Sequence, residues 1–135
     1  MRLLGIDYGK KRVGIALSDD KGMMAFPKAV VANDNFLFSA IRELVQGHGI
    51  ETIVVGDSKN YQMADNPIMT HIRRFADELR RDLGVVVIYE PELLSSHQAA
   101  QAAHTTGRDD LSDASAAAII LQSYIDRMKF NNPTS

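Results

Sequence analysis

The chain begins with stretches of two-residue hydrophobic period. The apolar run Leu3–Ile6 leads into Asp7-Tyr8-Gly9, which predicts a buried strand followed by a turn. Residues 13–18 alternate branched apolar with small residues, which is typical of a second strand. Residues 23–32 predict a third strand, in which Pro27 favours an edge or bulge position. The first quarter of the chain is therefore expected to form an antiparallel meander.

Helical periodicity follows. Over residues 36–45 and 68–79 the apolar positions recur every three or four residues, which predicts two amphipathic helices. Asn33 or Asp34 is a candidate cap for the first helix. Gly84 is expected to end the second helix, since glycine readily adopts the left-handed conformation found after helix ends.

Two more strands and two more helices complete the pattern. Thr52–Val55 is a short apolar strand. Val85–Tyr89 is almost wholly β-branched, which is typical of a strand covered on both faces. Ser95 and Ser112 are candidate N-caps of a third helix and of a last helix.

The order of elements is three strands, a helix, a strand, a helix, a strand and then helices. Right-handed crossover connections place the later strands parallel to the first. We therefore expect an α/β fold with a mixed five-stranded sheet and helices on both faces, an order that matches the ribonuclease-H-like fold. Residues 1–135 are expected to form a single domain of this kind.

Composition excludes several classes of protein. With 45% hydrophobic and 24% charged residues, the chain has ordinary globular usage, so disordered and fibrous classes are excluded. No apolar run approaches the roughly 20 residues of a membrane helix, and no membrane association is expected. The absence of cysteine excludes a disulfide framework and a thiolate zinc site. A cytoplasmic location is the default expectation.

Acidic residues stand at the expected ends of three parallel strands and at the start of the last helix. They are Asp7, Asp57, Glu92 and Asp113. Each alone has a simpler interpretation as a turn, loop or helix-dipole acid. The expected topology, however, brings all four to one edge of the sheet, where their mutual repulsion calls for a cation. Oxygen ligands favour Mg²⁺ or Mn²⁺, and two such ions can clamp the oxygens of a phosphodiester.

A short basic run, Lys10-Lys11-Arg12, follows the first of these acids. It falls in the first predicted hairpin, next to Asp7, and can bind phosphates that flank a cleaved bond. The alternative is a solvated turn. The net charge of −2 does not indicate a general nucleic-acid binder, so any phosphate contact depends on local clusters of this kind.

Several motifs resemble the YqgF family, whose members are described as Holliday junction resolvases and as nucleases that mature the precursor of small-subunit ribosomal RNA. The opening segment, residues 5–19, reads GIDYGKKRVGIALSD and is very similar to the family's N-terminal motif. Residues 54–56, 92–96 and 113–124 are similar to its fourth strand, its glutamate segment and its closing helix. The resemblance spans nearly the whole chain.

The resemblance implies a ribonuclease-H-like nuclease that depends on Mg²⁺ or Mn²⁺. It assigns Asp7, Glu92 and Asp113 as catalytic, metal-binding acids, and it extends to Asp57 and Asp110 as additional ligands. The implied partner is nucleic acid, either structured RNA or branched DNA. The implied reaction is 5′-end maturation of precursor small-subunit rRNA or Holliday junction resolution, performed by a monomer or a homodimer.

Two other functions stay open. Pro91 and Leu93 replace an acid and an arginine that flank the family's glutamate, which favours a binding protein of the same fold that does not cut. Its partner would be nucleic acid or a ribosome-assembly factor. The Asp-x-Gly hairpin at Asp7 also occurs in actin-like and sugar-kinase folds that bind ATP, although their second phosphate and adenosine segments are missing from this chain.

Overall fold

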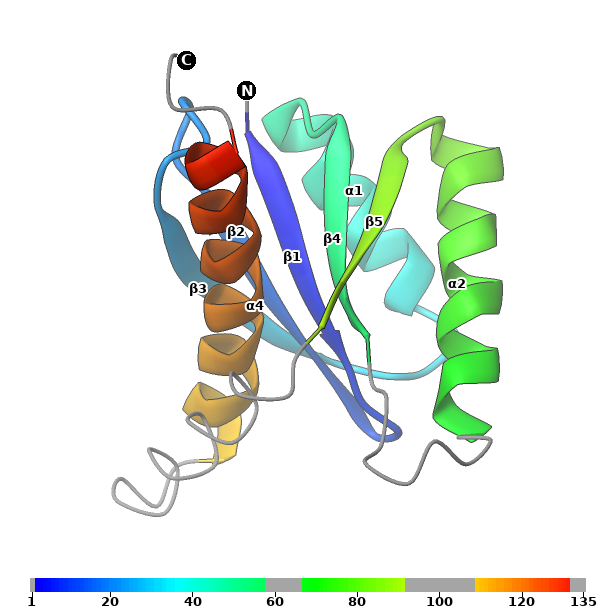
Figure 1. Cartoon of the computed structure of the whole chain (residues 1–135). Coiled ribbons are helices and arrows are strands. Elements are labelled where there is room, and N and C mark those ends of the chain that lie inside the picture. Colours follow the sequence, from blue (N-terminus) through cyan, green and yellow to red (C-terminus); the bar gives the residue numbers. More distant parts are fainter. Residues whose placement is uncertain (1, 58–66, 92–108, 132–135) are drawn as a thin grey trace.

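The computed structural model describes residues 2–57, 67–91 and 109–131. Within these residues, five strands form one mixed sheet in the order β3-β2-β1-β4-β5 (Figure 1). The strands are β1 (Leu3–Tyr8), β2 (Arg12–Ser18), β3 (Ala25–Ala32), β4 (Thr52–Asp57) and β5 (Val86–Pro91). The first three strands pair antiparallel, and β1, β4 and β5 pair parallel. The predicted meander and crossovers are thus confirmed.

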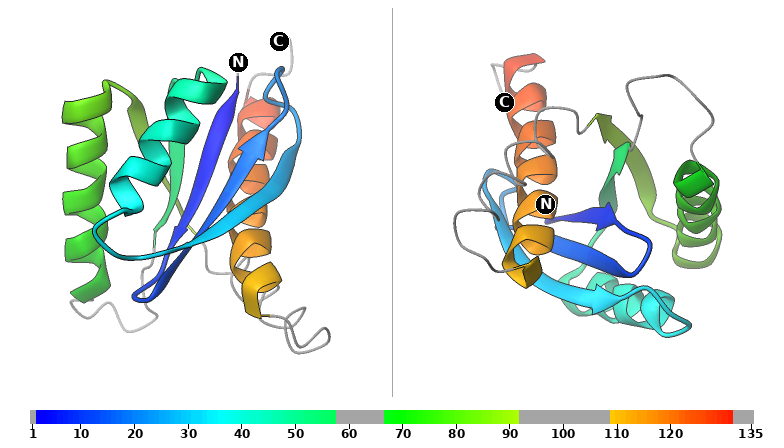
Figure 2. Two further views of the ribbon diagram at one scale, coloured as in Figure 1. Left: turned by 180° about the vertical axis from the view of Figure 1, so that it is seen from behind. Right: turned by 90° about the horizontal axis from the view of Figure 1, so that it is seen from below.

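Helices cover both faces of the sheet, as expected. One face carries α1 (Leu37–His48) and α2 (Pro67–Leu83), and the other carries α4 (Asp109–Asn131) (Figure 2). Successive residues of each strand point to opposite faces of the sheet, one toward α1 and α2 and the next toward α4. On β1, Leu4 and Ile6 are buried beneath α1 and α2, whereas Leu3 is buried beneath α4. None of the helices in the described residues is both long and apolar enough to cross a bilayer.

Glycines end both α1 and α2. Gly49 has a φ of 63° and donates its backbone N–H to Val45, so it closes α1. Gly84 has a φ of 67° and donates to Arg80, as predicted for the end of α2. The predicted cap of α1 is wrong. The helix starts after Phe36 with no side-chain cap, because Asp34 instead accepts a hydrogen bond from the Phe36 N–H in a turn that precedes it.

The edge position predicted from Pro27 is confirmed. β3 is an outer strand, and Ile15 pairs with Ala29 while the next residue, Ala16, pairs with Pro27. Lys28 is therefore the extra residue of a bulge. A proline is tolerated there because an outer strand leaves one row of its N–H groups outside the ladder.

Two other expectations need correction. β5 is the opposite outer strand, and Val86 is 56% exposed rather than covered on both faces. The cause is that α4 packs mainly over β1, β2 and β3 and reaches little of β5. The last helix begins at Asp109, three residues before the predicted cap Ser112. The helix predicted from Ser95 lies outside the described residues.

Candidate active site

The carboxyl ends of the three parallel strands meet the start of α4 at one edge of the sheet (Figure 1). In the register, Ile6 of β1 pairs with Val55 of β4, and Asp57 of β4 pairs with Pro91 of β5. Ligands of α/β sheets bind outside such strand ends, where loops and helix termini converge. The edge predicted to hold acidic residues is therefore formed.

Asp7 lies at this edge on the α4 side of β1. Its position follows from the strand alternation, since Leu3 and Gly5 of the same strand contact the layer of α4. Asp7 pairs with the buried Gly14 of β2 and is itself half-buried. The carboxylate is thus carried by a central strand with a neighbour on each side, which gives it a rigid backbone.

The close contact of α4 with Gly5 sets the helix in register with Asp7. A Cβ atom at Gly5 would lie 3.0 Å from the carbonyl oxygen of Ala117, so helix and strand meet there. Asp113 lies one turn before Ala117, about 6 Å along the helix. Asp7 lies two residues after Gly5, about 6.7 Å along an oppositely directed strand. The backbone of Asp113 therefore runs level with that of Asp7.

The remaining predicted ligands are placed only in part. Asp57 ends β4, and Asp110 lies in the first turn of α4, which starts early enough to include it. Glu92 directly follows β5 and lies outside the described residues. Among the side chains that the structure describes, which include Asp7 but not those of Asp57, Asp110 and Asp113, no three acidic or histidine side chains form a group that could hold a metal ion. The donor set expected at the edge consists of carboxylates, which fits Mg²⁺ or Mn²⁺ by chemistry.

The basic run forms the tip of the β1–β2 hairpin beside Asp7. Gly9 donates its N–H to the Arg12 carbonyl over 3.0 Å, and a Cβ atom at Gly9 would lie 2.5 Å from that oxygen. Only glycine fits this turn, which leaves Lys10 and Lys11 at the tip. Lys10, Lys11 and Arg12 are all exposed, as phosphate-binding cations need to be.

Asn33 supports this hairpin and was not predicted to do so. Its side-chain amide donates to the Gly9 carbonyl over 2.7 Å, and its backbone N–H donates to the Lys11 carbonyl over 2.9 Å. Sequence analysis assigned Asn33 only as a possible helix cap. A residue directly after an outer strand of a meander lies beside the preceding hairpin, and that signal could have indicated this role.

Glu90 is a second unpredicted polar residue, and only 3% of its surface is exposed. One carboxylate oxygen accepts a hydrogen bond from Ser123 over 3.0 Å, and the other pairs with Arg127. Both partners lie on α4, so Glu90 links β5 to the helix. Because both oxygens are engaged, Glu90 serves as a structural link beside the candidate site rather than as a ligand within it.

Comparison with known proteins identifies the family. The model of the family described as "RuvX: Holliday junction resolvase" matches residues 1–127. The chain belongs to the RuvX family. The resemblance to YqgF proteins noted from the motifs is thereby confirmed. A relative from Geobacillus thermodenitrificans, named "Putative pre-16S rRNA nuclease", is 36% identical, and the match covers 93% of this chain and 98% of the relative.

Solved structures confirm the ribonuclease-H-like fold of this RuvX-family chain. Thermus thermophilus RuvC superposes with a TM-score of 0.60 at 16% identity, over 95% of this chain and 96% of RuvC. The fowlpox virus resolvase, solved with Holliday junction DNA, superposes with a TM-score of 0.61 at 11% identity, over 95% of this chain and 99% of the resolvase.

Proposed function

We propose that this RuvX-family chain is a metal-dependent nuclease that hydrolyses phosphodiester bonds in structured nucleic acid, with residues 1–135 acting as one nuclease domain. The favoured substrate is precursor small-subunit rRNA, because the Geobacillus relative at 36% identity carries that substrate in its name. Four-way junction DNA, named for the family model and for the fowlpox complex, is the competing substrate.

One observation carries the proposal. The register of β1, β4 and β5 and the contact of α4 with Gly5 bring Asp7, Asp57, the residue before Glu92 and the start of α4 to one sheet edge. Carboxylates from four separate segments would repel one another at this edge without a cation between them. Their positions support a site for hard divalent ions.

In this proposal Asp7, Glu92 and Asp113 hold Mg²⁺ or Mn²⁺, and Asp57 and Asp110 complete the set. The bound ions supply Lewis acidity toward a phosphodiester and favour the deprotonation of water. The protein contributes a rigid scaffold: Asp7 is fixed by a central strand, and Asp113 is fixed in register with it by helix packing.

Lys10, Lys11 and Arg12 bind the substrate backbone in this proposal. Their hairpin starts two residues after Asp7, so phosphates next to the cleaved bond come within reach of its exposed tip. Hydrogen bonds of Gly9 and Asn33 hold the tip of the hairpin in place. Less conformational entropy is therefore lost when the tip binds phosphate. The hydrolysis adds one water across a P–O bond, which leaves a phosphate on one new end and a hydroxyl on the other.

The decisive experiment is cleavage of a substrate panel by the wild type and by Asp7→Asn. The panel contains a precursor rRNA fragment that spans the mature 5′ end, an unstructured RNA and a four-way DNA junction, each with Mg²⁺, Mn²⁺ or EDTA. We expect metal-dependent cleavage of the rRNA precursor by the wild type and none by Asp7→Asn, which removes one charge at nearly constant volume. Preferential cutting of the junction would instead assign the resolvase reaction.

A second function has a specific observation in its favour. Pro91 ends β5 directly before Glu92, where the family pattern has an acid. If no substrate is cut with either metal while the rRNA precursor is bound by wild type and Asp7→Asn alike, the chain is a binding protein of the same fold. Sedimentation of the same samples distinguishes monomer from homodimer.

A further inference from the structure

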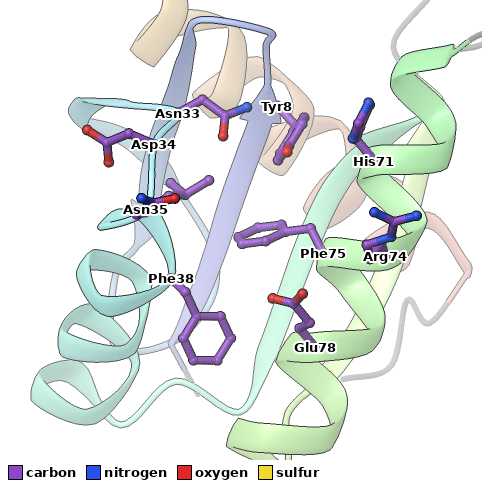
Figure 3. A pocket seen from close by; sticks show the side chains of 10 residues that line it. Tyr8, Asn33, Asp34, Asn35, Phe38, His71, Arg74, Phe75 and Glu78 are labelled. Atoms are coloured by element: carbon purple, nitrogen blue, oxygen red, sulfur yellow. The ribbon is translucent and has the colours of Figure 1, made fainter.

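A polar and aromatic groove lies on the face of the sheet opposite α4, between α1, the β3–α1 loop and α2 (Figure 3). One cavity has a volume of about 280 Å³, and a larger neighbouring cavity of about 480 Å³ shares Tyr8, Asn33 and His71 with it and extends to Lys10. Together they form one groove that ends beside the β1–β2 hairpin. Asp7, the proposed catalytic acid whose side chain the structure describes, does not line it.

Aromatic rings line the interior of this groove. Phe38 of α1 is partly exposed in it, whereas Phe75 of α2 is only 7% exposed and belongs to the core beneath it (Figure 3). The rings of Tyr8 and Phe75 pack in a tilted arrangement with centroids 5.4 Å apart, so Tyr8 is held at the upper end of the groove. Partly exposed rings such as those of Phe38 and Tyr8 suit a flat aromatic ligand, such as a nucleobase.

Hydrogen-bond donors line the groove, and two of them are cations. Lys10 comes from the hairpin, and His71 and Arg74 lie three residues apart on the same side of α2. All three are exposed, and within the described residues neither Lys10 nor Arg74 takes part in an ion pair. The guanidinium of Arg74 is thus available to a phosphate, which it matches in geometry.

Acceptors line the groove as well. Asp34 and Glu78 contribute carboxylates, and Asn35 contributes an amide (Figure 3). A groove that contains both cations and acidic groups does not suit a plain polyanion, which the acids would repel. It suits a nucleotide, whose phosphate is anionic and whose base carries N–H donors.

The groove lies next to the candidate active site along the chain. Tyr8 directly follows Asp7, and strand alternation places their side chains on opposite faces of the sheet. A nucleic-acid strand that leaves Asp7 across the hairpin tip therefore meets Lys10 first and the groove next. The same hairpin connects both surfaces.

We propose that this groove binds one unpaired nucleotide of the substrate strand, with its base against Phe38 and its phosphate against Lys10, His71 and Arg74. The proposal rests on the proposed function, because the bound strand is the one that is cut at Asp7. It adds a requirement for an unpaired nucleotide beside the cleaved bond, which a fully paired duplex does not meet.

Adjacent arginines on α2 give a matched test. Arg73 and Arg74 are both exposed, but only Arg74 lines the groove. Binding of a fluorescent single-stranded oligoribonucleotide is measured by anisotropy in EDTA over a range of salt concentrations. We expect Arg74→Ala to flatten the salt dependence by about 0.7, the value for one phosphate contact with a single strand, and Arg73→Ala to leave it unchanged. Equal slopes for the two variants would overturn the phosphate site.

The base is tested with Phe38→Leu, which keeps an apolar side chain but removes the ring. We expect about fivefold or greater weakening, since stacking on an aromatic side chain contributes about 1–3 kcal/mol per base. An oligoribonucleotide with one abasic position, scanned along the strand, should lose affinity for the wild type and not for Phe38→Leu. Thermal melting checks that the variant is folded, and an abasic loss shared equally by both proteins would refute the base site.

Failure of this proposal is distinguishable from failure of the proposed function. All of these binding measurements are made without metal and require no cleavage. If Asp7→Asn still cuts RNA, the catalytic assignment is wrong, while an altered slope for Arg74→Ala alone still supports the groove. If Asp7→Asn is inactive and Arg73→Ala and Arg74→Ala bind alike, the groove is refuted and the catalytic edge stands.

Discussion

Gly5 and Leu121 meet at the contact between the central strand β1 and helix α4. A Cβ atom at Gly5 would lie only 2.8 Å from the Cβ of Leu121, closer than real side chains approach. The glycine therefore lets the helix lie directly on the strand. This contact fixes the height of α4 along β1 and, about two helical turns before Leu121, the level of Asp113 beside Asp7.

Gly5→Ala tests this contact. We expect it to destabilise the fold by about 1–3 kcal/mol, because the added methyl would also lie 3.0 Å from the Ala117 carbonyl in the helix backbone. Gly47→Ala is the matched control, since nothing lies within 4 Å of its Cβ position and helix propensity favours alanine by about 1 kcal/mol. Urea unfolding measures both. A Gly5→Ala protein as stable as the wild type would contradict the close packing.

Asp7→Asn is expected to lose the stabilisation that Mn²⁺ gives the wild type. At a concentration a hundredfold above Kd, a ligand adds about 2.7 kcal/mol, which raises Tm by on the order of 10 °C in a chain of this size. Without metal the variant should be at least as stable as the wild type, because carboxylate repulsion falls. Glu43→Gln, an exposed acid on α1, is the control. Equal Tm gains for all three proteins would remove Asp7 from the ligand set.

The hairpin cations are tested by the double variant Lys11→Ala, Arg12→Ala. We expect weaker binding of unrelated sequences alike and a salt slope reduced by about 0.7 to 0.9 for each lost phosphate contact. Lys28→Ala, an exposed lysine in the bulge of β3, serves as the control for a lost positive charge. An unchanged slope in the double variant would assign the hairpin tip to solvent.

Loss of the Glu90 carboxylate and loss of its partner Arg127 should destabilise the fold by different amounts. Arg127 is half exposed, so Glu90→Gln leaves a cation that water can solvate and should cost about 1 kcal/mol. Arg127→Met leaves a buried carboxylate with only Ser123 and should cost about 3 kcal/mol. Chemical unfolding of both variants measures the difference. The reverse order of stabilities would show that the carboxylate is not buried as a charged group.

The strands and the direction of the later ones could be predicted from local period and chain direction. Alternation defines the strands, and right-handed crossovers predict that β4 and β5 run parallel to β1. Pro27 indicated an outer strand because proline has no N–H to donate to a ladder, which does not depend on distant residues. Such features need only the neighbouring sequence and the general chirality of the backbone.

Features that depend on distant packing could not be predicted. Val86 belongs to a continuous branched run, and only the path of α4 decides that it stays exposed. Glu90 meets Ser123 and Arg127 across 33 and 37 positions, and no local pattern encodes those pairs. The start of α4 at Asp109 was missed because Ser112 is a preferred N-cap by type. Acids in the first turn also stabilise a helix N-terminus, and Asp109 and Asp110 are in that turn.

The last prediction concerns the additional acids. Asp57 ends β4 between the ends of β1 and β5, and Asp110 lies on α4 one turn before Asp113. If Asp57 is a ligand, Asp57→Asn should weaken Mn²⁺ binding nearly as much as Glu92→Gln, and Asp110→Asn should have a smaller effect. The reason is that an acid at a strand end is carried by a paired backbone, whereas the first turn of a helix frays more readily. Calorimetric Mn²⁺ titrations measure the affinities of the three variants. Asp82→Asn, near the C-terminal end of α2, is the control. Wild-type affinity in Asp57→Asn would limit the site to Asp7, Glu92 and Asp113.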